Sequence, residues 1–141
     1  MKIPVKSSLA IVACVAALLG CNSSNNTAES DTGSPVWTEQ SEQIVLTRFN
    51  GHTVDDADRY SVYDFSRDTL TSDALEQLKS IKTTTSDLGC SEDEQSYDVV
   101  VTDGSGLEQT FYSANKSCNN IEGDGFIALE QLNNFVESLS N

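Results

Sequence analysis

Histidine is almost absent from this chain, and the common catalytic motifs are missing. His52 is the only histidine among 141 residues, so a serine–histidine–aspartate triad would have to use it. The sequence contains no G-x-S-x-G motif, no H-E-x-x-H motif and no phosphate-binding glycine loop. His52 also follows Gly51 in an expected loop, which favours an exposed side chain over a general base. The sequence therefore predicts a protein that is not an enzyme and that carries no cofactor.

Basic residues are scarce as well. The chain has eight lysines and arginines against 22 aspartates and glutamates, a formal net charge of −14. Such a charge repels the phosphates of nucleic acids and anionic lipid surfaces, so both classes of partner are disfavoured. It is compatible with a basic protein partner, with bound cations, or with solubility alone.

A hydrophobic run long enough to span a membrane is also missing. The apolar run at residues 9–19 has eleven residues, and as a helix it would rise about 16 Å against a hydrocarbon core of ~30 Å. Lys2 and Lys6 precede the run, and small residues surround its end. This layout is typical of a secretory signal peptide, which we assign to residues 1–20.

The residues at the end of this signal resemble the lipobox of bacterial lipoprotein precursors. They read Leu-Leu-Gly-Cys at residues 18–21, and the resemblance covers residues 1–21 only. It implies cleavage before Cys21 and acylation of the Cys21 sulfur and new amino group. Each buried methylene contributes about 0.8 kcal/mol, so two or more acyl chains anchor a protein firmly to the lipid bilayer. Asn22 stands where the family's inner-membrane proteins have aspartate, which implies an outer-membrane lipoprotein whose domain faces the periplasm.

Residues 22–35 contain one alanine as their only apolar residue, so they predict a flexible tether. We divide the chain into the signal (1–20), the lipidated cysteine and linker (21–36), and a small acidic domain (37–141). Loss of Lys2 and Lys6 with the signal leaves six basic residues against 22 acidic ones, a net charge of −16.

Four cysteines are present, and the resemblance accounts for two of them. Cys14 leaves with the signal and Cys21 is acylated, so Cys90 and Cys118 remain. In an oxidising envelope such a pair favours a disulfide. The two cysteines flank an expected hairpin and would meet at its open end, so we predict a Cys90–Cys118 disulfide.

The domain reads as two hairpins, each followed by a helix. Residues 44–49 and 60–65 form the first expected hairpin, and residues 97–101 and 107–113 form the second. The sequence at 103–106, Asp-Gly-Ser-Gly, is a strong turn signal. Thr71 is placed to cap a helix at about 72–82, with a hydrophobic staple between Leu70 and Leu75. A second helix closes the chain over residues 129–139. The pattern predicts an α+β two-layer sandwich (ββαββα), with a four-stranded antiparallel sheet and two helices on one face.

Aromatic residues concentrate on these strands. Because side chains alternate along a strand, Tyr60 and Tyr63 must point to opposite sides of the sheet, as must Phe111 and Tyr112. Some aromatic rings therefore lie on the face without helices. Such a face, with acidic neighbours, predicts either a protein-binding surface or ordinary sheet decoration.

Residues 120–127 resemble the first part of an EF-hand calcium loop. Asn120, Glu122 and Asp124 supply oxygen atoms at alternate positions, and Gly125 occupies the sixth position, as this coordination requires. Gln131 stands at the twelfth position, where the family has a bidentate glutamate. The alternative is an acidic turn that begins the last helix, with no metal.

Taken together, these features predict a non-catalytic envelope lipoprotein with a protein-binding or structural domain. The first alternative is an acidic inhibitor of a basic secreted hydrolase, such as a lysozyme or protease, because a negative charge speeds capture of a cationic target. The second alternative is a calcium-binding lipoprotein.

Overall fold

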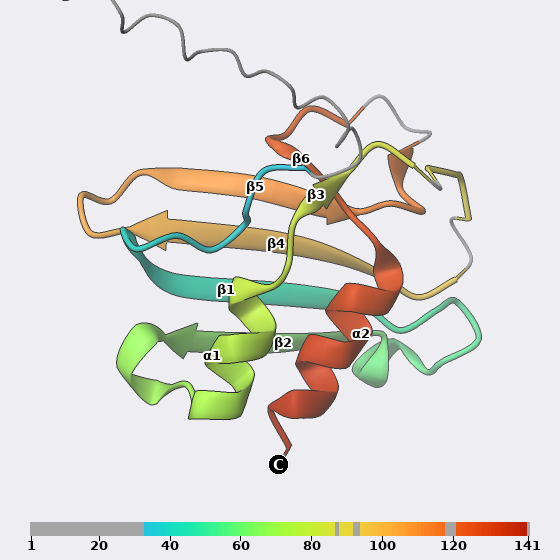
Figure 1. Cartoon of the computed structure of the whole chain (residues 1–141). Coiled ribbons are helices and arrows are strands. Elements are labelled where there is room, and N and C mark those ends of the chain that lie inside the picture. The colour runs from blue at the N-terminus through green and yellow to red at the C-terminus, as the bar shows by residue number, and fades with distance from the viewer. Residues whose placement is uncertain (1–32, 87, 92–93, 118–120, 141) are drawn as a thin grey trace, which may run out of the picture. The chain divides into compact units, whose positions relative to one another are not determined.

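Six strands and two α-helices make up the described part of the chain, which comprises residues 33–86, 88–91, 94–117 and 121–140 of a computed structural model (Figure 1). These residues belong to the compact unit Asp31–Asn141. In chain order the elements are β1 (Ser41–Phe49), the short 3-10 helix η2 (Asp56–Asp58), β2 (Tyr60–Ser66), the 3-10 helix η3 (Arg67–Thr69), α1 (Ser72–Lys79), β3 (Thr83–Thr84), β4 (Ser96–Asp103), β5 (Glu108–Ser113), β6 (Gly125–Ile127) and α2 (Leu129–Ser138).

The described strands form one mixed sheet in the order β2-β1-β4-β5-β6-β3. Neighbouring strands are antiparallel except β5 and β6, which are parallel. The α+β class is confirmed, but the predicted four-stranded, wholly antiparallel sheet is wrong. The strands that sequence reasoning missed, β3 and β6, have two and three residues, too few to show the alternation that predicts a strand.

The core lies between the sheet and the helices, and Figure 1 shows α1 and α2 on the same side of the sheet. The register places Leu46 of β1 between Tyr63 of β2 and Val99 of β4. Inward-facing residues of the strands and helices make one buried cluster: Ile44, Leu46, Val99, Val101, Phe111 and Ile127 from the sheet, and Ala74, Leu78, Leu132 and Phe135 from the helices.

The first helix begins where the sequence predicts. The Thr71 hydroxyl oxygen accepts a hydrogen bond from the Ala74 backbone N–H at 3.2 Å, which satisfies one free donor of the first turn. The helix ends at Lys79, because the chain then turns through Ile81 and continues into β3. The hydroxyl cap and this early turn limit α1 to eight residues.

The hairpin turn between β4 and β5 is organised by one carboxylate. Asp103 Oδ1 accepts hydrogen bonds from the Ser105 hydroxyl at 2.6 Å, the Ser105 backbone N–H at 2.8 Å and the Leu107 backbone N–H at 3.0 Å. These bonds, led by that from the Ser105 side chain, lower the pKa of Asp103 below its ordinary value. Gly106 has φ of 90°, a conformation that favours glycine.

Residues 34–36, which the sequence places in the linker, lie along β3. The Thr83 backbone N–H donates to the Ser34 carbonyl at 2.9 Å, and the Val36 N–H donates to the Ile81 carbonyl at 3.1 Å. Pro35 forms an isolated antiparallel bridge with Lys82, and Val36 is buried. The described part of the chain therefore enters the fold along this edge of the sheet.

Candidate functional site

One side of the sheet carries the residues that point away from α1 and α2, and we call this side the open face. Val45, Thr47 and Phe49 of β1 lie on it, and the register pairs them with Asp64, Val62 and Tyr60 of β2. On β4 and β5 the same face carries Asp98, Val100, Thr110 and Tyr112. The prediction that Tyr60 and Tyr63 point to opposite sides is confirmed: Tyr60 is 60% exposed, whereas Tyr63 packs against the core.

The most exposed apolar side chains of the open face lie on β2. Val62 is 64% exposed and Tyr60 is 60% exposed, and they lie two positions apart on one strand. Next to them the Phe49 ring packs against Tyr60 at a centroid distance of 5.5 Å and against His52 at 4.9 Å. An exposed group of this kind, rimmed by polar residues, marks interaction surfaces more often than isolated apolar residues do.

The surroundings of these side chains on the open face are acidic. Asp64 lies on the same face of β2, and its carboxylate accepts a hydrogen bond from the Gln43 amide at 2.8 Å. The loop that leads into β2 adds Asp55 and Asp58, both exposed. Strand β2 itself contains no lysine, arginine or proline. A cationic partner would therefore find both apolar surface and negative charge there.

The opposite half of the open face is neutralised internally. The Lys116 ammonium pairs with the Asp98 carboxylate and lies 5.2 Å from the centre of the Tyr112 ring. This cation comes from the segment after β5, which sequence reasoning did not assign to the face. The place of Lys116 on the open face could not be predicted from the sequence, because a lysine in a loop belongs to no periodic pattern. The place of Val62 on the open face could have been predicted, since residues two positions apart on a strand share one face and Val62 follows Tyr60 by two positions.

A buried polar network lies on the other side of the sheet, under α2. The Tyr97 hydroxyl donates to Asn133 Oδ1 at 2.8 Å, and the Gln95 amide donates to the same oxygen at 2.7 Å. Burial raises the pKa of Tyr97 above its ordinary value. The Tyr97 side chain is 1% exposed, so the network joins β4 to α2 rather than facing a substrate.

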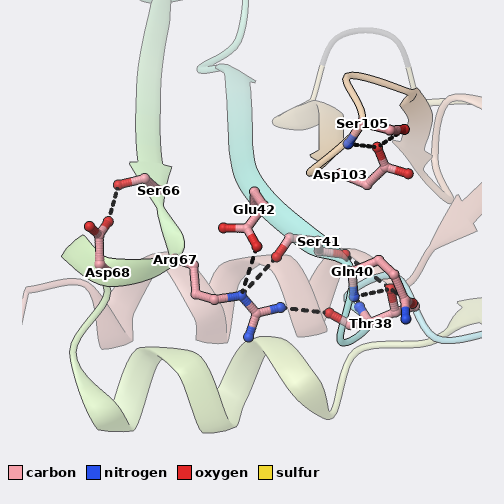
Figure 2. Close-up of polar contacts among 9 residues, drawn as sticks. All are labelled: Thr38, Gln40, Ser41, Glu42, Ser66, Arg67, Asp68, Asp103 and Ser105. Carbon is pink, nitrogen blue, oxygen red and sulfur yellow. Dashed lines mark hydrogen bonds and ion pairs between the residues drawn. The ribbon is translucent and has the colours of Figure 1, made fainter.

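Arg67 makes the most extensive set of polar contacts in Figure 2, and these are structural. Its guanidinium donates from Nε to the Ser41 carbonyl and from Nη2 to the Thr38 carbonyl, both at 2.8 Å. The same group lies 5.0 Å from the centre of the buried Trp37 ring. These contacts hold η3 against the start of β1.

Of the cysteines predicted to carry lipid or to form a disulfide, the structure describes Cys90. Cys21 and Cys118 lie outside the described residues. Cys90 forms an isolated antiparallel bridge with Lys116, and the Ser117 N–H donates to the Gly89 carbonyl at 3.1 Å. The chain around Cys90 thus runs alongside the residues that directly precede Cys118.

Of the residues proposed for calcium, the structure describes Glu122 and Asp124. Asn120 lies outside the described residues, and Glu122 is exposed. Asp124 Oδ2 accepts from the Thr110 N–H at 2.8 Å, and the Asp124 N–H donates to the Thr110 carbonyl. Residues 125–127 continue as β6. Within the described ranges, no group of three or more histidine, cysteine, aspartate or glutamate residues is placed to hold a metal ion.

Comparisons with protein-family models, with curated proteins and with solved structures find no match. Among the helices in the described part of the chain, none has the length and hydrophobicity needed to cross a membrane.

Proposed function

We propose that this protein is an outer-membrane lipoprotein, anchored through acylated Cys21, that binds a basic protein with the open face of its domain. The observation that carries the binding part is the exposure of Tyr60 and Val62, two positions apart on a strand that also carries Asp64 on the same face. Aromatic residues are enriched in protein interfaces, and Tyr60 supplies large contact area with a polar hydroxyl. The anchor rests on the lipobox at residues 18–21.

The negative net charge of the chain is the reason that we propose a basic partner. The chain after residue 20 has a net charge of −16, and a surface of one sign speeds association with a partner of the other sign. Binding should therefore weaken as salt rises, because the Debye length falls to about 8 Å at physiological ionic strength. Nucleic acid remains disfavoured for the same electrostatic reason.

A Cys90–Cys118 disulfide belongs to this proposal as a staple of the domain. It is supported by the bridge between Cys90 and Lys116, which lies two positions before Cys118. The bond would close the chain segment that carries the β4–β5 hairpin. Mass spectrometry of the unreduced protein would show the linked peptides, and two separate thiols at Cys90 and Cys118 would contradict the staple.

The binding proposal is tested by photo-crosslinking in living cells. A photoreactive amino acid replaces Val62 on the open face or, as the matched control, Glu76 on the exposed side of α1. We expect a discrete adduct with a basic envelope protein from position 62 and none from position 76. No adduct from position 62, or an equal one from both positions, would contradict the proposal. An adduct with a cationic hydrolase would identify the inhibitory form of the same function.

The anchor is tested separately with radiolabelled palmitate. We expect label on the wild-type protein in the outer-membrane fraction and none on Cys21→Ser. An unlabelled wild-type protein would contradict acylation, but it would leave the crosslinking result to be judged by itself.

A further inference from the structure

The strand that carries Tyr60 and Val62 is also an edge of the sheet. Among the described strands, β2 stands at one end of the order and pairs only with β1, and Figure 1 shows it beyond β1 at the border of the sheet. Within the described residues, residues 60–65 pair with β1 and make no backbone–backbone hydrogen bond outside this ladder. An edge strand of this kind presents its remaining N–H and C=O groups to an added strand.

The register shows which backbone groups point outward. In an antiparallel pair, hydrogen-bonded and non-hydrogen-bonded residue pairs alternate. The Asn50 N–H donates to the Arg59 carbonyl at 2.8 Å, so the next pair, Phe49 with Tyr60, is of the non-bonded kind. In a non-bonded pair the backbone N–H and C=O groups point away from the partner strand, so those of Tyr60 point to the free edge of the sheet. Because the two kinds of pair alternate, the backbone groups of Val62 and Asp64 also point to the free edge.

The far end of β2 agrees with this assignment. The Ser66 backbone N–H donates to the Thr69 hydroxyl at 3.0 Å instead of to β1, as expected for the next residue in the outward series. Tyr60, Val62 and Asp64 therefore share two properties. Their backbone groups face the free edge, and their side chains lie on the open face.

We propose that an extended basic segment of the partner protein adds to β2 as a further strand; this inference rests on the proposed function and specifies its binding mode. Backbone bonds to Tyr60, Val62 and Asp64 would supply affinity, and side chains of the added strand would supply specificity. A lysine or arginine opposite Asp64 would form a cross-strand ion pair. An apolar residue opposite Val62 would cover the most exposed aliphatic side chain of β2.

Charge favours such a segment over a second copy of this chain. Two copies joined through β2 would bring together two chains that each carry a net charge of −16 after residue 20. They would also place two Asp64 carboxylates along the same short ladder without a cation, since β2 contains no lysine or arginine. A basic segment removes both sources of repulsion.

The test uses a capped peptide, Thr-Lys-Thr-Val-Thr-Lys-Thr, whose lysines and valine share one face when it is extended. It is titrated into the 15N-labelled chain from residue 21 onward with Cys21→Ser, which retains everything that the predicted cleavage leaves. We expect the largest amide shifts at Tyr60, Val62 and Asp64, with slower hydrogen exchange of these three amides. The control peptide has glutamate in place of both lysines and should bind at least about tenfold more weakly, a difference of about 1.4 kcal/mol.

Variants of the strand test the backbone geometry directly. Val62→Pro removes an outward N–H that the β1 ladder does not use, so we expect a folded protein whose peptide affinity falls about tenfold or more. Val62→Thr keeps that N–H and should bind within about twofold of wild type. Asp64→Lys, which leaves the backbone intact, should lose the lysine peptide and bind the glutamate peptide instead.

Several outcomes would overturn the edge mode. One is wild-type affinity in Val62→Pro with shifts centred on Val100, in the middle of the open face; this result leaves the proposed function standing. Another is a concentration-dependent dimer of the chain that Val62→Pro abolishes, which would assign the edge to a second copy. A third is the absence of any shift with the lysine peptide. The proposed function itself fails only with the crosslinking experiment.

Discussion

The two edges of the sheet differ in length and in what lies against them. β2 offers seven residues, with Val62 and Tyr60 exposed at alternate positions. β3 has two residues, and residues 34–36 hydrogen-bond along it, with Pro35 in the outermost position. Proteins commonly shorten or cover their sheet edges to prevent unwanted pairing. In the part of the chain that the structure describes, the entering segment covers one edge, and no strand pairs with the other edge beside the exposed apolar side chains.

The same contrast holds for charge on the open face. Toward β5, the Lys116 ammonium neutralises Asp98 and covers Tyr112. On β2, among the described residues, the Asp64 carboxylate accepts its hydrogen bond from the neutral Gln43 amide and has no ion pair. The difference indicates that the β3 side of the sheet is completed within the chain, whereas the β2 side is suited to an external cation.

The largest expected effect compares burial toward the two ends of the sheet, at β6, which lies next to the edge strand β3, and at the edge strand β2. Ile127 of β6 is fully buried, so Ile127→Ala should lower the free energy of unfolding by about 2–5 kcal/mol. Val62→Ala should change it by no more than about 0.5 kcal/mol, because the side chain is exposed. Urea denaturation of both variants measures the comparison. Equal losses would mean that Val62 contributes to folding rather than to binding.

A pair of proline variants tests the register of β2. The alternation places the Tyr63 N–H in the ladder with Leu46, so Tyr63→Pro should destabilise the domain by about 3 kcal/mol through the lost bond and an unsatisfied carbonyl. Val62→Pro should cost about 0.5 kcal/mol, as for a solvent-facing edge position. Thermal denaturation followed by circular dichroism compares them. A larger loss in Val62→Pro would reverse the assignment of outward groups.

The covered edge depends on close contact at Gly33. A Cβ atom there would lie 1.8 Å from the Thr83 carbonyl oxygen, so Gly33→Ala must displace the entering segment. We expect a loss of about 1–3 kcal/mol, as for overpacked sites, and faster exchange of the Thr83 amide. Gly89→Ala is the control, because a Cβ atom there meets nothing within 4 Å. A Gly33→Ala protein as stable as the control would show that the entering segment can move away from β3 without a loss of stability.

The smallest expected effect is a pH dependence of stability caused by Tyr97, which lies on β4 between the two edge strands. Burial raises the pKa of Tyr97 in the folded state, while an unfolded tyrosine ionises near pH ~10. The stabilisation is therefore complete below pH ~10 and is lost as the pH rises through the folded pKa. The melting temperature and the absorbance at 295 nm, which reports tyrosine ionisation, would be measured between pH 8 and 12. Above pH ~10 the melting temperature should fall while the absorbance rises. Tyr97→Phe should remove this slope, whereas Val62→Ala should retain it.

Much of the fold could be predicted because its long elements carry clear periodicity. The hairpins β1–β2 and β4–β5 and both α-helices appear where alternation, the Thr71 cap and the Asp103 turn place them. Strands β3 and β6 could not be predicted, since β6 owes its place to pairing with Phe111 and Tyr112, which lie more than ten residues earlier. Short strands are fixed by such distant partners and not by their own sequence.

A short sequence repeat shows the same limit: Ala-Leu-Glu-Gln-Leu occurs at residues 74–78 and again at residues 128–132. Residues 74–78 lie within α1, whereas Ala128, the first residue of the second copy, is the N-cap of α2. Both copies nevertheless bury their last leucine, Leu78 and Leu132. Local sequence sets the apolar spacing, while the preceding strand sets where the helix begins. For the candidate site, alternation identified Tyr60 but gave no sign that β2 would be an edge, because strand order depends on the whole sheet.

The strand order also bears on how the protein would respond to mechanical load. Five interstrand steps of about 4.8 Å separate β2 from β3, and an added strand beside β2 and the entering segment beside β3 contribute one step each. The ligand would therefore stand about 34 Å across the sheet from the entering chain. A pull between a membrane anchor and that ligand would act perpendicular to the strands, loading the ladder bonds in succession like a zipper. Force spectroscopy with attachment points at Gly33 and Val62 should therefore record rupture at lower force than stretching along β1, from Ser41 to Phe49.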